Sequence, residues 1–205
     1  MMVRSPERGG RMDLKKPLAA AIVAIAVAAG SASQAPAAES GKISVDLYVM
    51  SLCPFGVQAE NGIFPAAKAL RERVDLQLHF IGQEGPGADG KPAFTALHGE
   101  PEVRENIRQV CAMELFADRY MDYILERNKS YKGIDWRTPA KAAGIDANKL
   151  EACFKGSQGE ALYRKNLEAA RKRGADASPT IDIDGQPYTR ARSQGWVTVA
   201  LCEAM

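Results

Sequence analysis

The chain has 205 residues, of which 46% are hydrophobic and 25% are charged, a composition typical of a globular protein with one sizeable core. Its 27 basic and 25 acidic side chains leave a formal net charge of +2, and no cluster of Lys and Arg with interleaved aromatic residues is present. This balance argues against nucleic acid as a partner.

The N-terminal segment has the pattern of a secretory signal peptide. Arg11, Lys15 and Lys16 precede a short apolar run over 17–29, and small residues follow over 35–38. A positive region, an apolar region and an A-x-A-like site are the three parts of such a signal. The apolar run is shorter than the ~20 residues that a membrane-spanning helix needs.

We therefore expect residues 1–37 to be a cleaved signal, with Met12 as an alternative start of translation. Residues 38–42 carry no core pattern and predict a tether. A mature chain that begins near residue 38 would work in an oxidising compartment, so we expect a periplasmic or secreted protein. Retention of the segment as a membrane anchor is the alternative.

The next segment places a cysteine between a strand and a helix. Residues 43–50 are rich in β-branched and aromatic side chains and predict a strand. Cys53 and Pro54 follow at the start of a helix predicted to end near residue 73, because proline fits the first helical turn. Unpaired amides and the helix dipole at such a start favour a thiolate, which is the nucleophilic form of cysteine. The alternative is that Cys53 is a buried, unreactive side chain.

Residues 74–81 alternate apolar and polar side chains and predict a second strand, which would complete a parallel βαβ unit. Residues 82–99 are interrupted by Gly and Pro and predict a loop. From residue 101 the pattern is helical. We expect one long helix over 101–128 and three shorter ones that end near Gly174, a helical insertion over about 100–173.

The sheet is predicted to resume at Thr180–Asp182, with a hairpin turn at Asp184-Gly185 and a returning strand over 188–191. A final helix over about 193–203 carries Cys202. The proline of Ser178-Pro179 could simply begin an edge strand. Combined with a Cys-Pro helix start, a cis-proline there would instead present the backbone of residue 178 to an extended substrate near the thiolate.

The order of these elements resembles the thioredoxin superfamily, and in particular its DsbA-like branch, over most of residues 43–205. The resemblance implies a thioredoxin-like α/β fold with an inserted all-helical subdomain. We expect Cys53 to be catalytic. The expected substrate-binding residues are Pro54, Phe55, Ser178, Pro179 and Thr180.

A narrower resemblance lies in the spacing His98-Gly99-x-x-Glu102-x-x-x-Asn106-x-x-x-x-Cys111, which is similar to the signature of the gamma-interferon-inducible lysosomal thiol reductase family. That family has cysteines where this chain has Ala96 and Val103, and it usually keeps a second active-site cysteine where this chain has Gly56. We expect Glu102 and Asn106 to bond back to the preceding loop, and we do not expect His98 to be catalytic.

Four cysteines allow three pairings, and the sequence alone does not choose among them. The preferred disulfide is Cys111–Cys153, because both residues belong to the predicted helical insertion, and it would stabilise the fold by about 4 kcal/mol. Cys53 is then either free, or it has the distant Cys202 as its resolving partner, the thiol that attacks a mixed disulfide formed at Cys53. The sequence has no metal-ligand spacing and no phosphate-binding Gly-rich motif, so no metal or cofactor is expected.

These features predict an exported thiol-disulfide oxidoreductase in which Cys53 exchanges disulfides with protein or small-thiol substrates, helped by an external thiol reductant or oxidant. The alternative from another class is a non-catalytic peptide-binding or assembly module. A glutathione-dependent transferase is a third interpretation, for which the sequence shows no pocket.

Overall fold

A computed structural model describes residues 41–70, 72–87 and 92–205. The expected signal over 1–37 and most of the expected tether lie outside the described residues. Within the described part of the chain, no helix is both long enough and apolar enough to cross a membrane.

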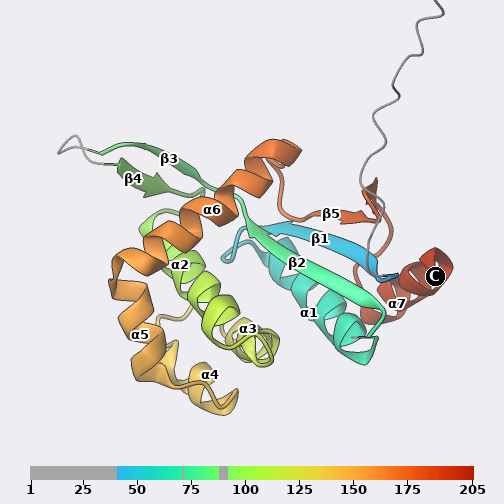
Figure 1. The fold of residues 1–205 in the computed structure, drawn as a ribbon, viewed down its shortest axis with the longest axis horizontal. Coiled ribbons are helices and arrows are strands. Elements are labelled where there is room, and N and C mark those ends of the chain that lie inside the picture. The colour runs from blue at the N-terminus through green and yellow to red at the C-terminus, as the bar shows by residue number, and fades with distance from the viewer. Residues whose placement is uncertain (1–40, 71, 88–91) are drawn as a thin grey trace, which may run out of the picture. The chain divides into compact units, whose positions relative to one another are not determined.

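A four-stranded sheet is built on β1 (Ile43–Val49), as Figure 1 shows. It pairs in parallel with β2 (Val74–Phe80), which confirms the predicted βαβ unit, and antiparallel with β5 (Thr180–Ile183). The strand order is β2-β1-β5-β6. Because β1 is central, the chain that leaves its C-terminal end is fixed by neighbours on both sides.

The returning strand of the last hairpin begins earlier than expected. Asp184 and Gly185 both have positive φ, 47° and 71°, as a two-residue turn requires, so the turn is confirmed. The returning strand predicted over 188–191 is wrong: β6 is Gln186–Pro187. Since the turn contains only two residues, pairing begins immediately after it.

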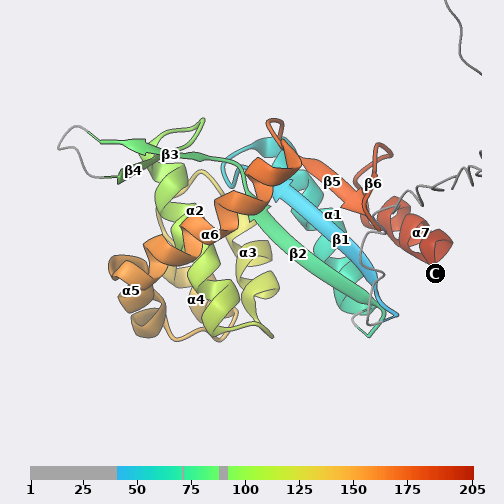
Figure 2. The same ribbon diagram turned by 45° about the horizontal axis from the view of Figure 1, so that its top comes forward.

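Two sets of helices cover the sheet. α1 (Pro54–Ala69) lies on one side together with α7 (Gln194–Ala204), and α6 (Ser157–Arg173) lies on the other (Figures 1 and 2). The contact between α1 and the start of α7 depends on Gly62, because a Cβ atom there would stand 1.8 Å from the carbonyl oxygen of Arg192.

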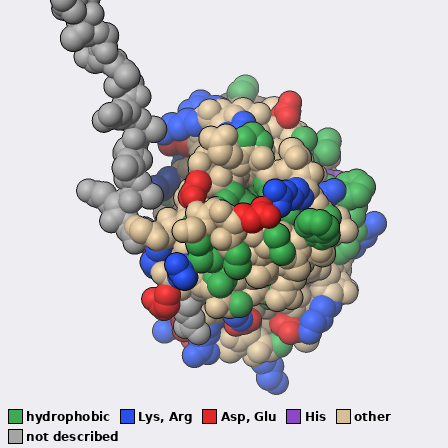
Figure 3. Space-filling model, turned by 90° about the vertical axis from the view of Figure 1, so that its right-hand side faces the viewer, with side chains coloured by type: hydrophobic (Ala, Val, Ile, Leu, Met, Phe, Trp, Pro, Cys, Tyr) green, Lys and Arg blue, Asp and Glu red, His purple; other side chains and the backbone are tan. Residues whose placement is uncertain are grey.

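The outer face of α7 is partly apolar. Val197 and Leu201 are buried, whereas Trp196 and Val199 are exposed. Figure 3 views the molecule from this end, and hydrophobic side chains are visible there among the charged ones. α7 therefore packs with one face and leaves apolar side chains on the other.

The segment between the second and fifth strands is mainly helical. Besides α6, it contains α2 (Glu100–Leu115), α3 (Tyr120–Asn128), α4 (Arg137–Ala142) and α5 (Ala147–Lys155). The predicted cap at Asp146 is confirmed, since its carboxylate accepts hydrogen bonds from two backbone amides at 2.9 and 3.1 Å. The end of α6 at Gly174 is also as predicted, and Gly174 has left-handed geometry there.

The prediction of a single helix over 101–128 is wrong, because the helix is interrupted between Leu115 at the end of α2 and Tyr120 at the start of α3. Phe116 leaves helical geometry at φ −142° and ψ 53°. The break turns α3 so that Tyr120 and Tyr123 are buried. No Gly or Pro lies between residues 116 and 119, so the sequence carries no local breaker there.

The loop predicted over 82–99 contains a small hairpin of its own. β3 (Gln83–Pro86) and β4 (Pro92–Thr95) form a separate antiparallel sheet. Its anchors are on α6: Arg164 binds Glu84 through nitrogen–oxygen contacts of 2.6–2.9 Å, and Phe94 packs edge-to-face on Tyr163 at 5.0 Å. Contacts with a helix far along the chain therefore order a segment rich in Gly and Pro.

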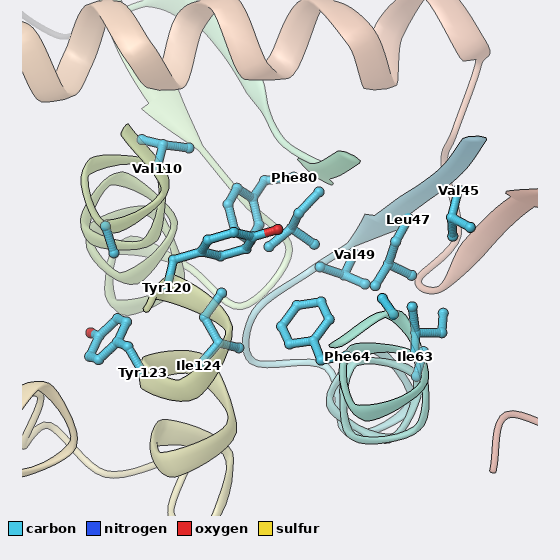
Figure 4. Packing of buried hydrophobic residues seen from close by; sticks show 14 of the residues in the cluster. Val45, Leu47, Val49, Ile63, Phe64, Phe80, Val110, Tyr120, Tyr123 and Ile124 are labelled. Atoms are coloured by element: carbon cyan, nitrogen blue, oxygen red, sulfur yellow. The ribbon is translucent and has the colours of Figure 1, made fainter. Parts of the chain in front are cut away.

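The core joins the sheet to the helical segment through α1. Figure 4 shows Phe64 and Ile63 of α1 beneath Leu47 and Val49 of β1, with the α3 side chains beyond. Phe64 is 0% exposed and meets Tyr120 edge-to-face at 6.2 Å. Burial of an aromatic side chain of this size contributes up to about 3 kcal/mol. The packing fixes α1, and with it the residue at its N-terminus.

Candidate active site

Cys53 is the residue that precedes the first turn of α1, with Pro54 at the first helical position. Its backbone is extended at φ −78° and ψ 124°. The amide of Cys53 donates to Met50 O at 2.9 Å, and its carbonyl accepts from Val57 N at 3.0 Å. These two bonds hold the cysteine at the strand-to-helix junction that the sequence predicts, where its side chain is half-buried.

The structure brings Cys53 and Ser178 together. The thiol of Cys53 donates to the carbonyl oxygen of Ser178, with Sγ 3.6 Å from that oxygen. The Ser178–Pro179 peptide bond is cis. Thr180, the first residue of β5, pairs with Tyr48 of β1, and this pairing places the Ser178–Pro179 segment beside the end of β1.

The space beside Gly56 is already filled. A Cβ atom at residue 56 would lie 2.7 Å from Ser178 Oγ and 3.0 Å from Met50 O. The Ser178 hydroxyl is held in place because it accepts a hydrogen bond from Met50 N at 2.9 Å. Position 56, where the family resemblance would place a second cysteine, is therefore closed by backbone and by a fixed hydroxyl.

Phe55 stands in solvent next to the cysteine, with 58% of its surface exposed. Its ring lies 5.5 Å from the guanidinium carbon of Arg192, on the segment that leads into α7. A large exposed aromatic ring beside a cysteine can contact an apolar side chain of another molecule.

A buried carboxylate supports the turn before Cys53. Glu102, in the first turn of α2, is 0% exposed, and its Oε1 accepts from Leu52 N at 2.9 Å. Its other oxygen accepts from His98 N at 3.1 Å, and His98 Nδ1 lies 2.9 Å from Oε1. The expected bond from Glu102 back to the loop is present, but the bond to Leu52 was not predicted.

Two other residues of the His98–Cys111 spacing, Asn106 and Gly99, also have structural roles. Asn106 donates to the Tyr163 hydroxyl on α6 at 3.0 Å, so the expectation that it bonds back to the loop is wrong. Burial raises the pKa of Tyr163 to about 12, which keeps this hydroxyl neutral. Gly99 has φ +79°, a conformation that favours glycine, just before α2 begins.

Cys111 and Cys153 form a disulfide between α2 and α5, with their Cα atoms 5.9 Å apart, so the preferred pairing is confirmed. Gly159 packs against it, since a Cβ atom there would lie 2.6 Å from Cys153 O and 3.3 Å from Cys111 Sγ. The bridge therefore ties together the three helices α2, α5 and α6.

Cys202 is free and exposed near the C-terminal end of α7. The start of α7 packs beside Gly62, and the C-terminus then lies away from the first turn of α1 in Figures 1 and 2. No bond joins Cys202 to Cys53 in the described structure. The same part of the chain contains no group of three His, Cys, Asp or Glu side chains arranged to hold a metal ion.

Known proteins resemble this chain both in fold and in the His98–Cys111 spacing. Residues 44–135 match the family described as gamma interferon inducible lysosomal thiol reductase, a range that includes Cys53 and the His98–Cys111 spacing. A curated protein of Arabidopsis thaliana, described as a gamma-interferon-responsive lysosomal thiol protein, is 27% identical over 161 residues. That alignment covers 74% of this chain and 65% of the relative, so the chain spans less than two thirds of its length.

Solved structures are similar in fold at low sequence identity. The thiol-disulfide exchange protein alpha-DsbA2 of Wolbachia pipientis has a TM-score of 0.60 and 12% identity, with 82% of this chain and 84% of that chain covered. A thioredoxin-like oxidoreductase of Silicibacter pomeroyi has a TM-score of 0.54 and 14% identity, with 80% and 87% covered.

The protein therefore has the thioredoxin-like α/β fold, with an inserted helical segment as in DsbA-type proteins. Within that fold class, its sequence is similar to the gamma-interferon-inducible lysosomal thiol reductase family, as the His98–Cys111 spacing predicts.

Proposed function

We propose that the protein is an exported thiol-disulfide oxidoreductase that works with one nucleophilic cysteine, Cys53. The observation that carries the proposal is the 3.6 Å contact between Cys53 Sγ and the carbonyl oxygen of Ser178. The contact joins a half-buried cysteine at a helix start to backbone that can pair with an extended substrate. The positive end of α1 stabilises the sulfur anion.

In the first step, the Cys53 thiolate attacks one sulfur of a substrate disulfide. A Cys53–substrate disulfide forms, the substrate S–S bond breaks, and the other substrate sulfur leaves as a thiolate. Exposed Phe55 contacts the substrate near the reacting sulfur, and the segment Ser178–Thr180 orients its chain.

The second step requires a thiol from outside the chain, because position 56 is closed and Cys202 lies elsewhere. An external thiolate attacks the mixed disulfide and releases the substrate thiolate. A second external thiolate then frees Cys53 and forms the external disulfide, so two external thiols supply the two electrons that reduce one substrate disulfide. The reverse sequence oxidises a substrate dithiol.

The test is exchange with a fluorescent peptide disulfide in the presence of 2-mercaptoethanol. Cys53→Ser should lose all exchange above the uncatalysed rate, and Cys202→Ser should keep the wild-type rate. Unchanged turnover in Cys53→Ser would remove the enzymatic proposal. Loss of turnover in Cys202→Ser would instead assign the resolving step to that residue.

A peptide-binding module without catalysis is the second candidate, favoured by the closed position at Gly56 and the exposed ring of Phe55. Trapping separates the two proposals. A catalyst accumulates covalent complexes with envelope proteins through Cys53, and these complexes are released by reductant. A binder captures the same proteins without a disulfide.

Export is part of the proposal, and the disulfide supports it. Cys111 and Cys153 are 0% and 4% exposed, and such bridges persist in oxidising compartments. Intact-mass analysis of the protein from its native host should find a chain that begins near residue 38. A chain that retains residues 1–37 would show that the segment is not cleaved.

A further inference from the structure

A cavity of about 310 Å³ lies next to the turn that holds Cys53. Leu52, the residue before the nucleophile, forms part of its wall. The remaining wall comes from α2, the end of α3 and the segment that leads to α4, and its charged residues are Glu100, Arg104, Glu105, Arg108, Arg127 and Lys132. Its volume is at the lower end of the range for small-molecule sites.

Positive charge predominates in this wall, with four cationic and two carboxylate side chains. Two of the cations are buried: Arg108 is 7% exposed and Arg127 is 4% exposed. Both depend on one carboxylate, because Glu105 lies 2.7 Å from Arg108 and 3.4 Å from Arg127. Two buried guanidinium groups therefore share one carboxylate, and one positive charge is left without a matching negative charge in this cluster.

Glu60, a buried carboxyl that interacts electrostatically with Arg127, does not compensate the extra positive charge. Glu60 is 1% exposed, and burial raises its pKa to about 8, with the charge of Glu105 acting in the same direction. At neutral pH its carboxyl is therefore mostly protonated. In addition, Nε of Arg108 has no hydrogen-bond partner among the described residues. A buried, incompletely paired cation is costly, and an anion in the adjoining space would offset that cost.

Aromatic rings fix the cation at the wall of the cavity. The guanidinium of Arg108 lies 5.0 Å from the ring centre of Trp136 and 4.6 Å from that of Phe154. Arg104 and Lys132 are exposed and line the same cavity together with one exposed carboxylate, Glu100, which lies 3.7 Å from Arg104, so positive charge exceeds negative charge on its exposed side. The site thus has a rigid buried cation and a cationic entrance.

We infer that this cavity binds the carboxylate of a small thiol and so selects carboxylate-bearing thiols as the external partner of Cys53. The inference rests on the proposed function and names the class of its second substrate. The bound molecule's thiolate attacks the Cys53–substrate disulfide. The old S–S bond breaks as the new one forms, and the departing thiolate takes a proton from solvent. A second molecule completes the two-electron reduction.

The kinetic test compares mercaptoacetate with 2-mercaptoacetamide, which has an amide in place of the carboxylate. The measured quantity is the ratio of their rate constants for releasing a Cys53–peptide mixed disulfide at low ionic strength. Comparison of ratios between protein variants cancels the intrinsic reactivity of each thiol. In Arg104→Gln/Lys132→Gln we expect the ratio to fall about threefold to tenfold, the effect of two exposed charges.

The matched control is Lys149→Gln/Lys165→Gln, which changes net charge equally with residues that do not line the cavity. Its ratio should remain that of the wild type. Equal ratios in the wild type and the cavity variant would overturn the inference, as would an equal fall in the control, which would assign the effect to overall charge.

A binding measurement separates this inference from the proposed function. In Cys53→Ala, titration with (methylthio)acetate, which has no free thiol, should shift backbone NMR signals around Leu52 and Arg108, and the Arg104→Gln/Lys132→Gln changes should weaken the binding. If the anion binds in this way and Cys53 nevertheless catalyses no exchange, the cavity stands and the proposed function fails. If exchange proceeds without anion binding, the proposed function stands and the cavity inference fails.

Discussion

Glu102, on α2, supports the turn that precedes Cys53. Its carboxylate accepts from the backbone of Leu52 and of His98, and it lies within hydrogen-bond distance of the His98 ring. All of these contacts are made by a residue that is fully buried. The position of Cys53 therefore depends on the start of α2, some fifty residues further along the chain.

Glu102→Gln should destabilise both the fold and the turn. The glutamine keeps one acceptor oxygen, but its NH₂ group faces a donor where the second oxygen was, a change worth about 1–3 kcal/mol. Urea unfolding should show this loss, and Cys53 should react at a changed rate with a thiol reagent. The control is Glu100→Gln, because Glu100 is an exposed residue of the same helical turn. Equal stability in the two variants would argue against the supporting role.

Glu60 gives the protein a pH dependence that can be tested. In the folded state its pKa is raised to about 8, from an ordinary value of 4.5, chiefly by burial. The folded state therefore keeps a proton that the unfolded state loses, and the free energy of unfolding should fall as pH rises from about 4.5 to about 8. Above that range the effect should level off.

Glu60→Gln should remove this dependence and keep the acceptor for Asn128 Nδ2, which lies 2.8 Å from Glu60 Oε2. Urea unfolding at pH 5 and at pH 8.5 measures the difference. The variant should lose less stability than the wild type between the two values, and exposed Glu72→Gln should behave as the wild type does. A parallel decline in wild type and Glu60→Gln would contradict the assignment.

Among the elements, α6 covers the edge of the sheet formed by β2. The side-chain amide of Asn166 accepts from Phe80 N at 2.7 Å and donates to Leu78 O at 2.8 Å, so it takes the place of a neighbouring strand. The opposite edge is β6, where Pro187 has no amide to donate. Both edges are thus protected from pairing with another chain.

Asn166→Ala should expose the edge of β2. The two backbone groups lose their partners, which we expect to lower the free energy of unfolding by about 1–3 kcal/mol. Hydrogen exchange at the Phe80 amide should become faster, whereas exposed Asn148→Ala should leave it unchanged. Unaltered protection of Phe80 in Asn166→Ala would show that the side-chain bond is dispensable.

For the whole molecule, the Cys111–Cys153 bridge links folding to the redox state of the compartment. It closes a loop that includes α3 and α4 and joins α2 to α5. On the chain-entropy argument, Cys111→Ala/Cys153→Ala should lower the free energy of unfolding by about 4 kcal/mol. Cys202→Ala, at an exposed position, should change it by less than about 0.5 kcal/mol. A small change in the double variant would mean that helix packing alone holds this region.

Features with local signals could be predicted from the sequence. The strand before Cys53, the proline at the helix start, the Asp184-Gly185 turn and the cap at Asp146 each follow from a few adjacent residues. The break between α2 and α3 has no such signal, and the β3–β4 hairpin depends on Arg164, which lies eighty positions from Glu84. Tertiary contacts therefore account for both errors.

The candidate site shows the same division. A Cys-Pro at a helix start, together with a Ser-Pro before a later strand, was enough to predict that Cys53 lies near Ser178. The bond between Glu102 and Leu52, and the excess of buried cations beside them, depend on how α2 and α3 pack, which adjacent residues do not encode. The sequence left three cysteine pairings open because pairing depends on the same packing.

The serine hydroxyl next to position 56 makes the single-thiol arrangement difficult to undo. A cysteine introduced at 56 alone would collide with Ser178 Oγ, and removal of that hydroxyl alone would leave the Met50 amide without its acceptor. A second thiol at 56 therefore demands changes at both positions, in segments more than a hundred residues apart, and a shift of the Met50 carbonyl, which a Cβ atom at 56 would approach to 3.0 Å. Each of these substitutions, made singly, should therefore destabilise the segment around Cys53.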